Sequence, residues 1–396
     1  MKILVTSQHY WPEPFPSTDL CEALAERGHT VHVVTDVPNY PMGTVYPEYR
    51  GGKGREEYRG GVKISRTFTI GRRNNILFRL LNYYSFSLSS ACYTRCLKED
   101  YDVVLSFQSS PVMMVRGGLT YGKKHKKKTA FYVMDLWPAS LAAGGMGEDS
   151  PVYKLFFRVS RKFYRRADRL LITSRMFREY LQENFAIDDE RIGYFPQYAA
   201  SQFDAMPAAP QKDTVDVMFA GNVGAAQSLT TVLEAADILR QNPKLRFHIV
   251  GDGSELERLQ QIAQQKNLSN VVFHGRKPAE EMPKFYAMAD AMVVTLTADK
   301  FIGLTLPAKV QSYMAAGKPI LAAANGEIPQ IVADARCGYC APAEDGVAFA
   351  QAVQEFLNSP DQKQLGKNAR AYYESHFTRQ QCIEKLEREL QKLAQE

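Results

Sequence analysis

The chain twice repeats an alternation of short apolar runs with helical patterns, and this alternation constrains its fold more than any other feature. Residues 2–6 (KILVT) and 30–35 (TVHVVT) are typical of buried parallel strands, and the helical stretch between them ends at Gly28. The same pattern begins again at residues 215–220 (VDVMFA) and 245–250 (LRFHIV). Strand–helix–strand units build parallel sheets covered by helices. The sequence therefore predicts an α/β fold with two successive doubly wound domains.

The domain boundaries follow from the composition between the two patterns. Residues 199–212 (AASQFDAMPAAPQK) are rich in alanine and proline and lack a helical stripe, so they are predicted to be a linker. An N-terminal domain is then expected at residues 1–198 and a C-terminal domain at 213–379, which suits a chain of 396 residues. A charged helix is expected at about 380–396, from where it can pack back onto the first domain.

Charge and composition narrow the class of protein. The net charge is +6, and residues 1–200 hold 29 Lys and Arg against 20 Asp and Glu, so the first half is the basic one. Such a surface is expected to face an anionic partner. No segment is apolar enough for a membrane span, the start lacks the features of a secretory signal, and six cysteines are too few for a disulfide scaffold. We therefore expect a cytoplasmic location.

Glycine-rich turns follow two of the strands predicted in the second half. Gly221-Asn222-Val223-Gly224 comes directly after one strand, with Gln227 just beyond it, and Gly251-Asp252-Gly253 follows the next strand. Ligands of open α/β sheets bind beyond the carboxyl ends of the strands, and glycine lets the backbone approach them closely. A helix start after the first turn would also offer unpaired N–H groups to an anion. The alternative is a pair of tight turns that bind nothing.

Lys309 occupies an unusual position for a cation. It lies in the first turn of a helix predicted at residues 308–316, which Pro307 begins and Gly317 ends. The start of a helix is its positive end, where an acid is preferred. A bound diphosphate would supply the missing negative charge, so we predict that Lys309 contacts the phosphates of a ligand. A solvated lysine is the alternative.

Asp135 is the candidate for acid–base chemistry in the first half. It follows a strand predicted at residues 130–134, so it lies at a carboxyl end, where it could accept a proton from a hydroxyl group or orient a sugar. The alternative is that Asp135 caps the helical segment that follows. Cys337 and Cys340 form a lone C-x-x-C without a second pair, and no cluster of histidines and cysteines has the spacing of metal ligands, so no metal site is predicted.

Several short motifs carry a resemblance to a known family. In the second half they are G-N-V-G at 221–224, I-V-G-D-G at 249–253, F-H-G-R at 273–276, P-A-K at 307–309 and Y-M-A-A-G-K-P-I at 313–320. In the first half they are the opening MKILVTSQHYWPE, P-N-Y-P-M-G at 38–43 and D-L-W-P at 135–138. In order and spacing they resemble the family-4 retaining glycosyltransferases of the GT-B fold. The first-half motifs resemble a bacterial branch that builds capsule and O-antigen repeat units and includes N-acetylfucosamine transferases.

This resemblance implies two Rossmann-like domains that face each other across a cleft. It implies a hexosyltransferase that moves a sugar with retention at the anomeric carbon in the assembly of bacterial surface polysaccharide. The donor would be a nucleotide-diphosphate sugar, expected to be UDP-linked, with an N-acetylated amino sugar or deoxy sugar as one option. The second half would bind it without a metal or another cofactor. The first half would bind the acceptor, a polyprenyl-diphosphate-linked sugar.

The residue patterns and the resemblance together give three groups of candidate site residues. The donor-binding group is Gly221, Asn222, Gly224, Gln227, Gly251, Gly253, Arg276, Lys309, Gln311 and Ser312. The catalytic candidates are Asp135 and Glu327, and the acceptor-binding candidates are His9, Glu13 and Asn39. His9 and Glu13 lie in the loop after the first strand, where either could also be an ordinary surface residue.

The chain departs from the family pattern at positions that usually carry charge. They are Asn222, Gln227, Leu304, Ser312 and Ala139, where the family often has two basic residues, two glutamates and, in the branch, a further glutamate. We expect Lys309 to replace the basic pair and Gln311, Ser312 or Glu327 to contact ribose or sugar hydroxyls. Two alternatives remain, a UDP-sugar 2-epimerase of the same fold and a non-catalytic protein that binds nucleotide or lipid for another transferase.

Basic residues next to apolar ones are predicted to form a membrane-binding surface in the first half. In a helix predicted at residues 152–166, one face is apolar and another is basic, and a lysine-rich run lies earlier in the chain, at 123–128. The basic residues of this surface are Arg72, Arg73, Arg79, Lys154, Arg158, Arg161 and Arg165. A basic amphipathic helix can lie on an anionic membrane, so we expect peripheral attachment to the inner face of the cell membrane. The alternative is core packing with a solvated basic face. Nucleic acid is not expected as a partner, because no known binding module is present.

Overall fold

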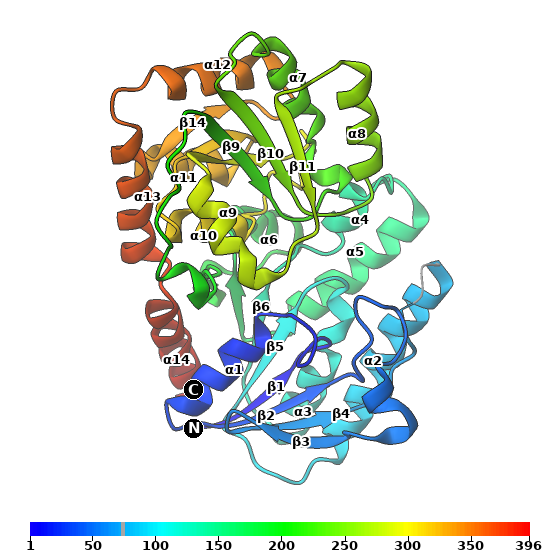
Figure 1. The fold of residues 1–396 in the computed structure, drawn as a ribbon. Coiled ribbons are helices and arrows are strands. Elements are labelled where there is room, and N and C mark those ends of the chain that lie inside the picture. The colour runs from blue at the N-terminus through cyan, green and yellow to red at the C-terminus, as the bar shows by residue number, and fades with distance from the viewer. Residues whose placement is uncertain (73–75) are drawn as a thin grey trace. The chain divides into compact units, whose positions relative to one another are not determined.

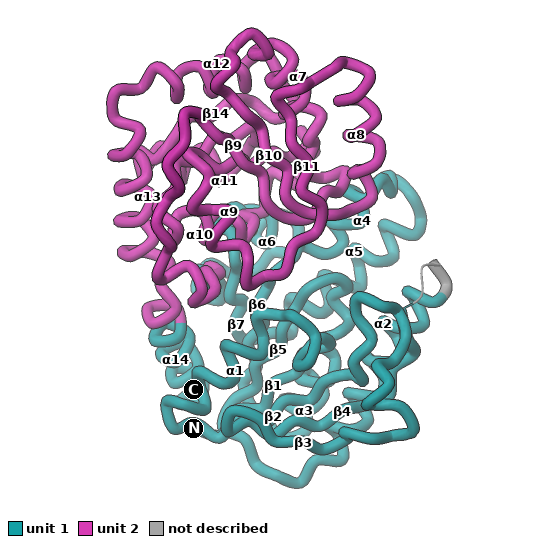
Figure 2. Tube along the Cα trace, viewed as in Figure 1, with its two compact units in different colours: residues 1–195, 383–396 teal, residues 196–382 magenta. Residues whose placement is uncertain are grey.

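The computed structural model describes residues 1–72 and 76–396, which form two units (Figure 2). The first unit comprises residues 1–195 and 383–396, and the second comprises residues 196–382. Each unit is built on a sheet of mostly parallel strands with helices packed against it (Figure 1). The predicted α/β fold with two doubly wound sheets is therefore confirmed.

In the described part of the first unit, the sheet has eight strands in the order β3-β4-β2-β1-β5-β6-β7-β8. Neighbouring strands are parallel except for the antiparallel pair β3 and β4. The strands are β1 (Lys2–Thr6), β2 (Thr30–Thr35), β3 (Glu56–Arg59), β4 (Val62–Arg66), β5 (Val103–Gln108), β6 (Thr129–Val133), β7 (Arg169–Ile172) and β8 (Ile192–Tyr194). Every residue of β5 and β6 is buried, which explains their continuous apolar runs.

The helices of the first unit pack against this sheet. They are α1 (Ser17–Glu26), α2 (Ile76–Cys96), α3 (Arg116–His125), α4 (Ala139–Ala143), α5 (Pro151–Tyr164), α6 (Phe177–Phe185) and most of α14 (Arg379–Gln395). Helix α14 contributes the buried Ile383, Leu386 and Leu390. Its Glu387 forms ion pairs with Arg27 at 2.6 Å and with His29 at 2.7 Å. These contacts complete the first unit with a segment that follows the second unit in the chain.

The second unit has a six-stranded sheet, among its described residues, in the order β11-β10-β9-β12-β13-β14. All neighbouring strands are parallel. The strands are β9 (Val215–Ala220), β10 (Leu245–Val250), β11 (Val271–Gly275), β12 (Ala291–Thr295), β13 (Ile320–Ala323) and β14 (Gly338–Ala341). The helices are α7 (Thr230–Ile238), α8 (Leu256–Gln265), α9 (Met282–Met288), α10 (Lys309–Ala315), α11 (Glu327–Ala335), α12 (Gly346–Asn358) and α13 (Gln362–His376).

The segment predicted as a linker, residues 199–212, packs onto the second unit. Phe203 is buried, and its ring stacks on that of Tyr286 with 4.7 Å between the centroids. At the other end of the segment, Nζ of Lys212 lies 2.6 Å from carboxylate oxygens of both Asp216 and Asp290. Phe203 and Lys212 therefore anchor this alanine- and proline-rich segment to the second unit.

Candidate functional site

The strand order of the second unit places its binding crevice. The connections run in one direction from β9 through β10 to β11 and in the other from β12 through β13 to β14, so the direction reverses between β9 and β12. Open α/β sheets bind ligands at such a reversal, beyond the carboxyl ends of the strands. The turn at 221–224 directly follows β9, so it lies at this position. Among the predicted donor-binding residues, this turn has the strongest topological support.

The two glycine-rich turns of the second unit pack directly on each other. Gly221 donates its N–H to the carbonyl oxygen of Val250, and Val223 donates to that of Asp252, both at 2.9 Å. A Cβ on Gly251 would lie 1.8 Å from the carbonyl oxygen of Gly221, and one on Gly253 would lie 2.3 Å from that of Val223. The fold therefore requires Gly251 and Gly253 whether or not a ligand binds.

Asn222 and Gln227 are joined across the first turn. The side-chain Oε1 of Gln227 accepts from Nδ2 of Asn222 at 3.4 Å and from the N–H of Gly224 at 3.3 Å. Gly221 and Asn222 are exposed, so the start of the turn is open to a ligand. The two amide side chains thus order a turn that lacks the basic residues usual in the resembled family.

Lys309 supplies the positive charge beside this turn. Its Nζ lies 3.9 Å from the ring centroid of Phe219 and would lie 3.2 Å from a Cβ on Gly221. Burial lowers the pKa of Lys309 to about 7. Among the described residues, no carboxylate forms an ion pair with it. An anion in the crevice would therefore favour the charged form of an amine that has no competing acidic partner.

Tyr313 fixes α10 beside the first turn. Its hydroxyl group donates to the carbonyl oxygen of Ala220 at 2.9 Å and accepts from the N–H of the same residue at 3.1 Å. Tyr313 is fully buried, so these bonds are shielded from water. The helix therefore holds Lys309 next to the end of β9.

The other predicted donor-side residues do not all reach the crevice. Gln311 is fully buried, and its amide donates to the carbonyl oxygens of Pro307 at 3.0 Å and Ala308 at 3.3 Å. The side chain of Gln311 thus stabilises the start of α10, and its predicted donor contact stays a prediction. Ser312 donates to the carbonyl oxygen of Ala308 at 3.3 Å and stays partly exposed. Its part in donor binding stays a prediction.

Arg276 and Glu327 occupy contrasting environments. Arg276 is exposed directly after β11, at the carboxyl end where a ligand contact is expected. Glu327 is fully buried as the first residue of α11, which follows β13. Their predicted roles in donor binding and catalysis stay predictions.

The first unit has a corresponding reversal between β1 and β5. A small cavity of about 40 Å³ lies there, lined by residues that include His9 after β1, Ser109 after β5 and Met134 after β6. The ring of His9 stacks on that of Phe15 with 4.6 Å between the centroids. Of the three predicted acceptor-binding residues, His9 is the one that lines this cavity.

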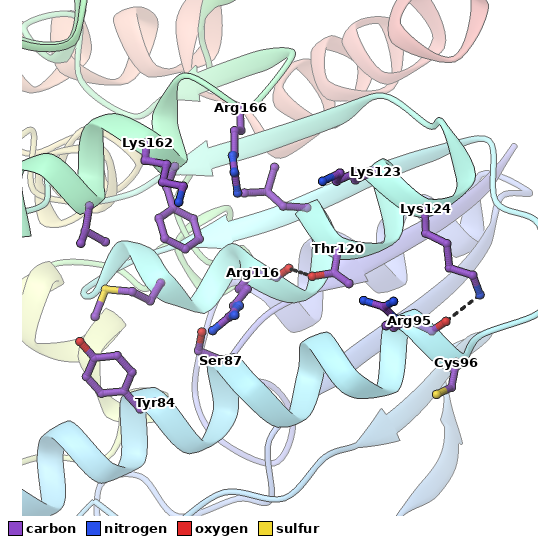
Figure 3. A pocket seen from close by; sticks show the side chains of 14 residues that line it. Tyr84, Ser87, Arg95, Cys96, Arg116, Thr120, Lys123, Lys124, Lys162 and Arg166 are labelled. Atoms are coloured by element: carbon purple, nitrogen blue, oxygen red, sulfur yellow. Dashed lines mark hydrogen bonds between the residues drawn. The ribbon is translucent and has the colours of Figure 1, made fainter.

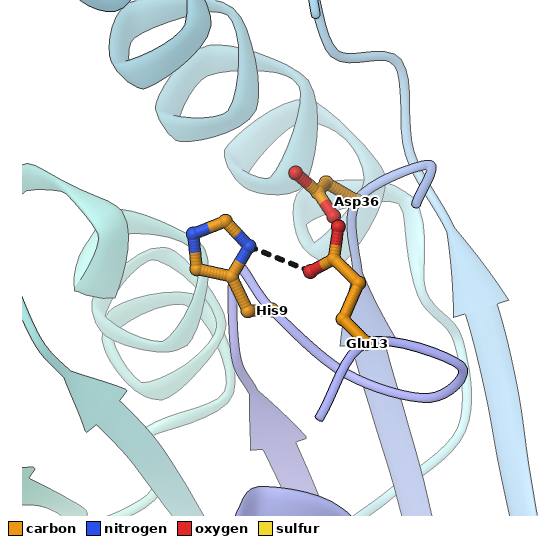
Figure 4. A group of neighbouring side chains, drawn as sticks. All are labelled: His9, Glu13 and Asp36. Carbon is orange, nitrogen blue, oxygen red and sulfur yellow. Dashed lines mark hydrogen bonds and ion pairs between the residues drawn. The ribbon is translucent and has the colours of Figure 1, made fainter. Parts of the chain in front are cut away.

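Glu13, drawn with His9 in Figure 4, and Asn39 are buried, and they order the loops around this cavity. One carboxylate oxygen of Glu13 lies 2.7 Å from Nδ1 of His9, and the other accepts the N–H groups of Asn39 and Tyr40 at 2.6 Å. The amide of Asn39 donates to Oδ2 of Asp36 at 3.0 Å. Glu13 therefore holds His9 and the loop that begins at Asn39. Direct contact of Glu13 and Asn39 with an acceptor stays a prediction.

Asp36 adds a second acid to this cluster. Burial raises its pKa well above the usual range, and the charge of Glu13 raises it further. The ligand atoms of His9, Glu13 and Asp36 lie within 4.8 Å of one another, close enough for a shared cation. Their hydrogen bonds to Asn39 and to the main chain already occupy most of the acceptor oxygens. The cluster therefore fits a proton-sharing hydrogen-bond network.

Asp135 follows β6, the strand next to β5, at the carboxyl edge of the first sheet. It accepts a hydrogen bond from the hydroxyl of Ser110, which in turn lies 3.0 Å from the hydroxyl of Ser140. Burial raises the pKa of Asp135, and these two serines partly oppose the increase. Helix α4 has no side-chain cap, so the capping alternative for Asp135 is not seen. A carboxyl group whose pKa is raised in this way is a candidate for proton transfer in a reaction.

Asp36, Ser110 and Phe219 are among the residues of these sites that were not predicted from the sequence. Asp36 follows β2 and Ser110 follows β5, so their positions after strands were signals that could have identified them. Phe219 lies inside β9, where an apolar run indicates only a core residue. Its contact with Lys309 depends on the packing of α10.

The predicted membrane surface is largely exposed on the first unit. On α5, Lys154, Arg158, Arg161 and the following Arg165 are exposed, as is Arg79 on α2, while Arg72 is half-buried and Arg73 lies outside the described residues. The apolar face predicted for α5 is not the core face, because Tyr153, Ser160 and Tyr164 are buried while Val152 remains 48% exposed. Within the described part of the chain, no helix combines the length and apolarity that a membrane crossing needs.

Comparisons with known proteins agree with this architecture. A family model described as Glycosyltransferase Family 4 matches residues 17–197, and one described as Glycosyl transferases group 1 matches residues 203–372. The chain is 29% identical to the probable glycosyltransferase WbjE of Pseudomonas aeruginosa over 65% of this chain and 67% of that protein. It is 28% identical to the putative colanic acid biosynthesis glycosyl transferase WcaI of Escherichia coli over 80% of this chain and 82% of that protein.

Solved structures share the fold across nearly the whole chain. The sucrose-phosphate synthase of Thermosynechococcus elongatus superposes with a TM-score of 0.76 at 19% identity, over 99% of this chain and 98% of that one. The Anabaena protein HepE, solved in complex with UDP, has a TM-score of 0.69 at 14% identity, over 99% and 100%. The two family models together span most of the sequence, and these neighbours have the predicted GT-B fold. The chain is therefore a glycosyltransferase of the GT-B type, whose N-terminal half matches the family 4 model and whose C-terminal half matches the group 1 model.

Proposed function

We propose that this glycosyltransferase moves a sugar from a UDP-linked donor to a polyprenyl-diphosphate-linked acceptor in the assembly of a bacterial surface polysaccharide. Lys309 carries the proposal, because it places a cation without an acidic partner beside the turn that follows β9. HepE was solved with UDP, and WcaI is named for colanic acid biosynthesis, which supports a nucleotide donor and a polysaccharide product. The proposed setting is the inner face of the cell membrane.

The proposed donor chemistry centres on the departing diphosphate. Negative charge grows on the diphosphate as its bond to the anomeric carbon breaks, and a fixed cation in a dry site stabilises that charge strongly. Lys309 and the exposed main chain of Gly221 and Asn222 are placed to do this. We propose that they act without a metal ion and that the sugar is transferred with retention.

Asp135 is proposed to act on the acceptor. The bond that forms joins the acceptor hydroxyl oxygen to the anomeric carbon, and the hydroxyl proton must leave. A carboxylate with a raised pKa can take that proton, while Ser110 and Ser140 hold it in position. The His9 side of the nearby cavity is proposed to contact the acceptor sugar, with Glu13 fixing the imidazole ring.

The test measures donor binding and turnover separately. UDP-, GDP- and dTDP-sugars are compared by thermal shift, and turnover is then followed with a polyprenyl-diphosphate sugar acceptor. We expect a UDP-sugar to raise the melting temperature of the wild type and of Lys284→Ala, an exposed control on α9, but not of Lys309→Ala. Asp135→Asn should keep the thermal shift and lower kcat by about 100-fold or more.

Three results would contradict the proposal. If no nucleotide sugar raises the melting temperature, the proposed donor site is contradicted. Release of an isomerised nucleotide sugar in the absence of any lipid acceptor would instead identify an epimerase. Donor binding with no transfer, and with Asp135→Asn indistinguishable from the wild type, would favour a non-catalytic binding protein.

A further inference from the structure

A groove of about 930 Å³ lies on the first unit, between α2, α3 and α5 (Figure 3). None of the candidate donor, acceptor or catalytic residues lines it. Six basic residues do, and they come from all three helices or directly follow them: Arg95, Arg116, Lys123, Lys124, Lys162 and Arg166. No aspartate or glutamate is among the lining residues. The groove is therefore a concave surface of one charge.

The small residues of α3 explain how this groove forms. A Cβ on Gly118 would lie 2.2 Å from Oγ of Ser106 in β5, so α3 lies closer to the sheet than a larger residue would allow. On the same helix, Arg116, Lys123 and Lys124 line the groove, and Figure 3 shows them between the side chains of α2 and those of α5. The helix thus forms the floor, with the flanking helices as walls.

Most of these cations have no counter-ion. Within the described residues, no carboxylate pairs with Arg95, Arg116, Lys123, Lys162 or Arg166, whereas Lys127 and Lys128 outside this groove are paired. Lys127 lies 3.0 Å from Asp100, and Lys128 lies 3.3 Å from Glu396. Crowded like charges destabilise a folded protein. Their concentration in one groove therefore indicates that an anion binds there.

The apolar side chains of the groove define the class of this anion. Tyr84, Met113, Leu119, Val159 and Phe163 also line it. A free phosphate would not use them, and the volume is that of a site for a small organic molecule. We infer that the groove binds an anionic phospholipid of the membrane surface, with its phosphate against the cations and part of its hydrocarbon chain against the apolar wall.

Helix α5 connects this groove with the membrane attachment proposed above, which the inference deepens. The groove face of α5 is formed by Val159, Lys162 and Phe163, because residues three and four positions apart lie on the same side of a helix. Arg166 follows the end of the helix and also lines the groove. Lys154, Arg158 and Arg161 lie on another face and are exposed. The exposed face is suited to the general negative charge of a membrane, and the groove to one lipid molecule.

The test is a vesicle-binding experiment with the whole chain. Binding is measured by co-sedimentation with phosphatidylcholine vesicles and with vesicles of three parts phosphatidylcholine to one part phosphatidylglycerol. The Arg116→Gln/Arg166→Gln variant should bind the anionic vesicles roughly thirtyfold more weakly, because each cation near such a surface contributes about a factor of five. The matched control is Lys363→Gln/Lys367→Gln, two exposed lysines of α13 in the second unit, which should bind like the wild type.

A second variant tests the lipid chain. Tyr84 is 43% exposed, so Tyr84→Ala should fold normally. We expect it to weaken binding to anionic vesicles at high as well as low salt, because apolar contacts are not screened by ions. Melting temperatures of all variants are measured first, so that a loss of binding is compared only among folded proteins.

Equal vesicle binding by the groove variant and the wild type would overturn the inference. A second outcome would also overturn it. In that outcome, pyrophosphate or a single-stranded oligonucleotide releases the wild type from vesicles but not the Arg116→Gln/Arg166→Gln variant, and Tyr84→Ala binds vesicles like the wild type. Transfer to a short-chain, water-soluble acceptor is measured in parallel, and the groove variant should retain it. If the wild type binds vesicles but transfers no sugar to this acceptor, the result contradicts the proposed function and leaves the lipid-binding inference intact.

Discussion

At the scale of single residues, the environment of Lys309 is the feature with the most chemical consequence. The side chain lies over Phe219 and beside Gly221, and burial lowers its pKa from 10.5 to about 7. A diphosphate next to Nζ would favour the charged form and raise that pKa again. Donor binding should therefore be linked to proton uptake wherever free Lys309 is neutral.

This linkage predicts a pH-dependent affinity for UDP. Because Lys309 in the free protein loses its proton as the pH rises through about 7, affinity should fall between about pH 7 and pH 9, by up to about tenfold per unit. Isothermal titration calorimetry in two buffers of different ionisation enthalpy measures the proton uptake directly. A flat affinity across this range, without proton uptake, would contradict the assignment.

Lys309→Met is the control for this prediction. Its UDP binding should be weak and independent of pH in the same range. The ligand-free variant should also melt at a higher temperature than the wild type at neutral pH. Lys309 has a pKa of about 7 in the folded protein and about 10.5 in the unfolded chain. Between these two pH values only the unfolded chain keeps the proton, so the free energy of unfolding of the wild type is lowest below pH 7 and rises towards pH 10.5.

The sequence could identify Lys309 but not the direction of its neighbours. Helical spacing placed Gln311 and Lys309 on one short helix, and a rotation of about 100° per residue then directs the two side chains differently. Gln311 turns into the core, where it bonds to Pro307 and Ala308. Which face of a seven-residue helix meets the crevice depends on packing, here on the two hydrogen bonds of Tyr313 to Ala220.

At the scale of elements, the glycine-rich turns after β9 and β10 act as one packed unit. The sequence identified both turns from their position after apolar strands. It could not show that they contact each other, because that contact depends on the strand order β10-β9-β12. The close approach of Gly251 to Gly221 shows that a glycine beside a ligand crevice can be required by the protein itself.

Gly251→Ala should therefore destabilise the fold strongly. Its φ angle of +146° is one that only glycine adopts readily, and the new Cβ would overlap the carbonyl oxygen of Gly221. Strain and overpacking together should lower the free energy of unfolding by about 2–5 kcal/mol. Urea denaturation measures the change.

Gly275→Ala provides the matched comparison. Gly275 also has a positive φ angle, +65°, but nothing lies within 4 Å of the Cβ that alanine would add. It should cost only the backbone strain of about 1–2 kcal/mol. Similar losses in the two variants would show that the packed turns relax, which would contradict the tight contact between them.

Helix α5 shows which core residues a local pattern does not identify. Its aliphatic and phenylalanine side chains predicted one apolar face for a membrane, and its buried residues are Tyr153, Ser160 and Tyr164. The hydroxyl of Tyr164 donates to Oε1 of Gln108 at 3.0 Å, so a polar partner makes its burial favourable. Such a partner is invisible in the local sequence, because it lies on another element.

At the scale of the whole molecule, the first unit is assembled from two distant segments. Residues 383–396 belong to it although they follow the complete second unit, as Figure 2 shows in one colour. The sequence predicted a helix here, but not the ion pairs of Glu387 with Arg27 and His29, which join residues about as far apart as the chain allows. Local periodicity carries no information about such partners.

Leu390→Ala should lower the stability of the first unit. Leu390 is fully buried, and removing its side chain should cost about 2–5 kcal/mol. Hydrogen exchange is expected to accelerate in α1 and β2 rather than in β9 and β10. Gln391→Ala, at the exposed neighbouring position, serves as the control and should leave exchange unchanged. Faster exchange confined to the second unit would contradict the assignment of this helix to the first.

The placement of residues 383–396 also sets an order of events during protein synthesis. The ribosome makes residues 1–195 first, yet the helix that covers Arg27 and His29 emerges only after residues 196–382 have been made. During translation, the surface of the first unit that contacts α14 therefore stays uncovered until the second unit has been synthesised. Any change that keeps α14 from docking should therefore destabilise the first unit, although most of that unit is encoded before the second.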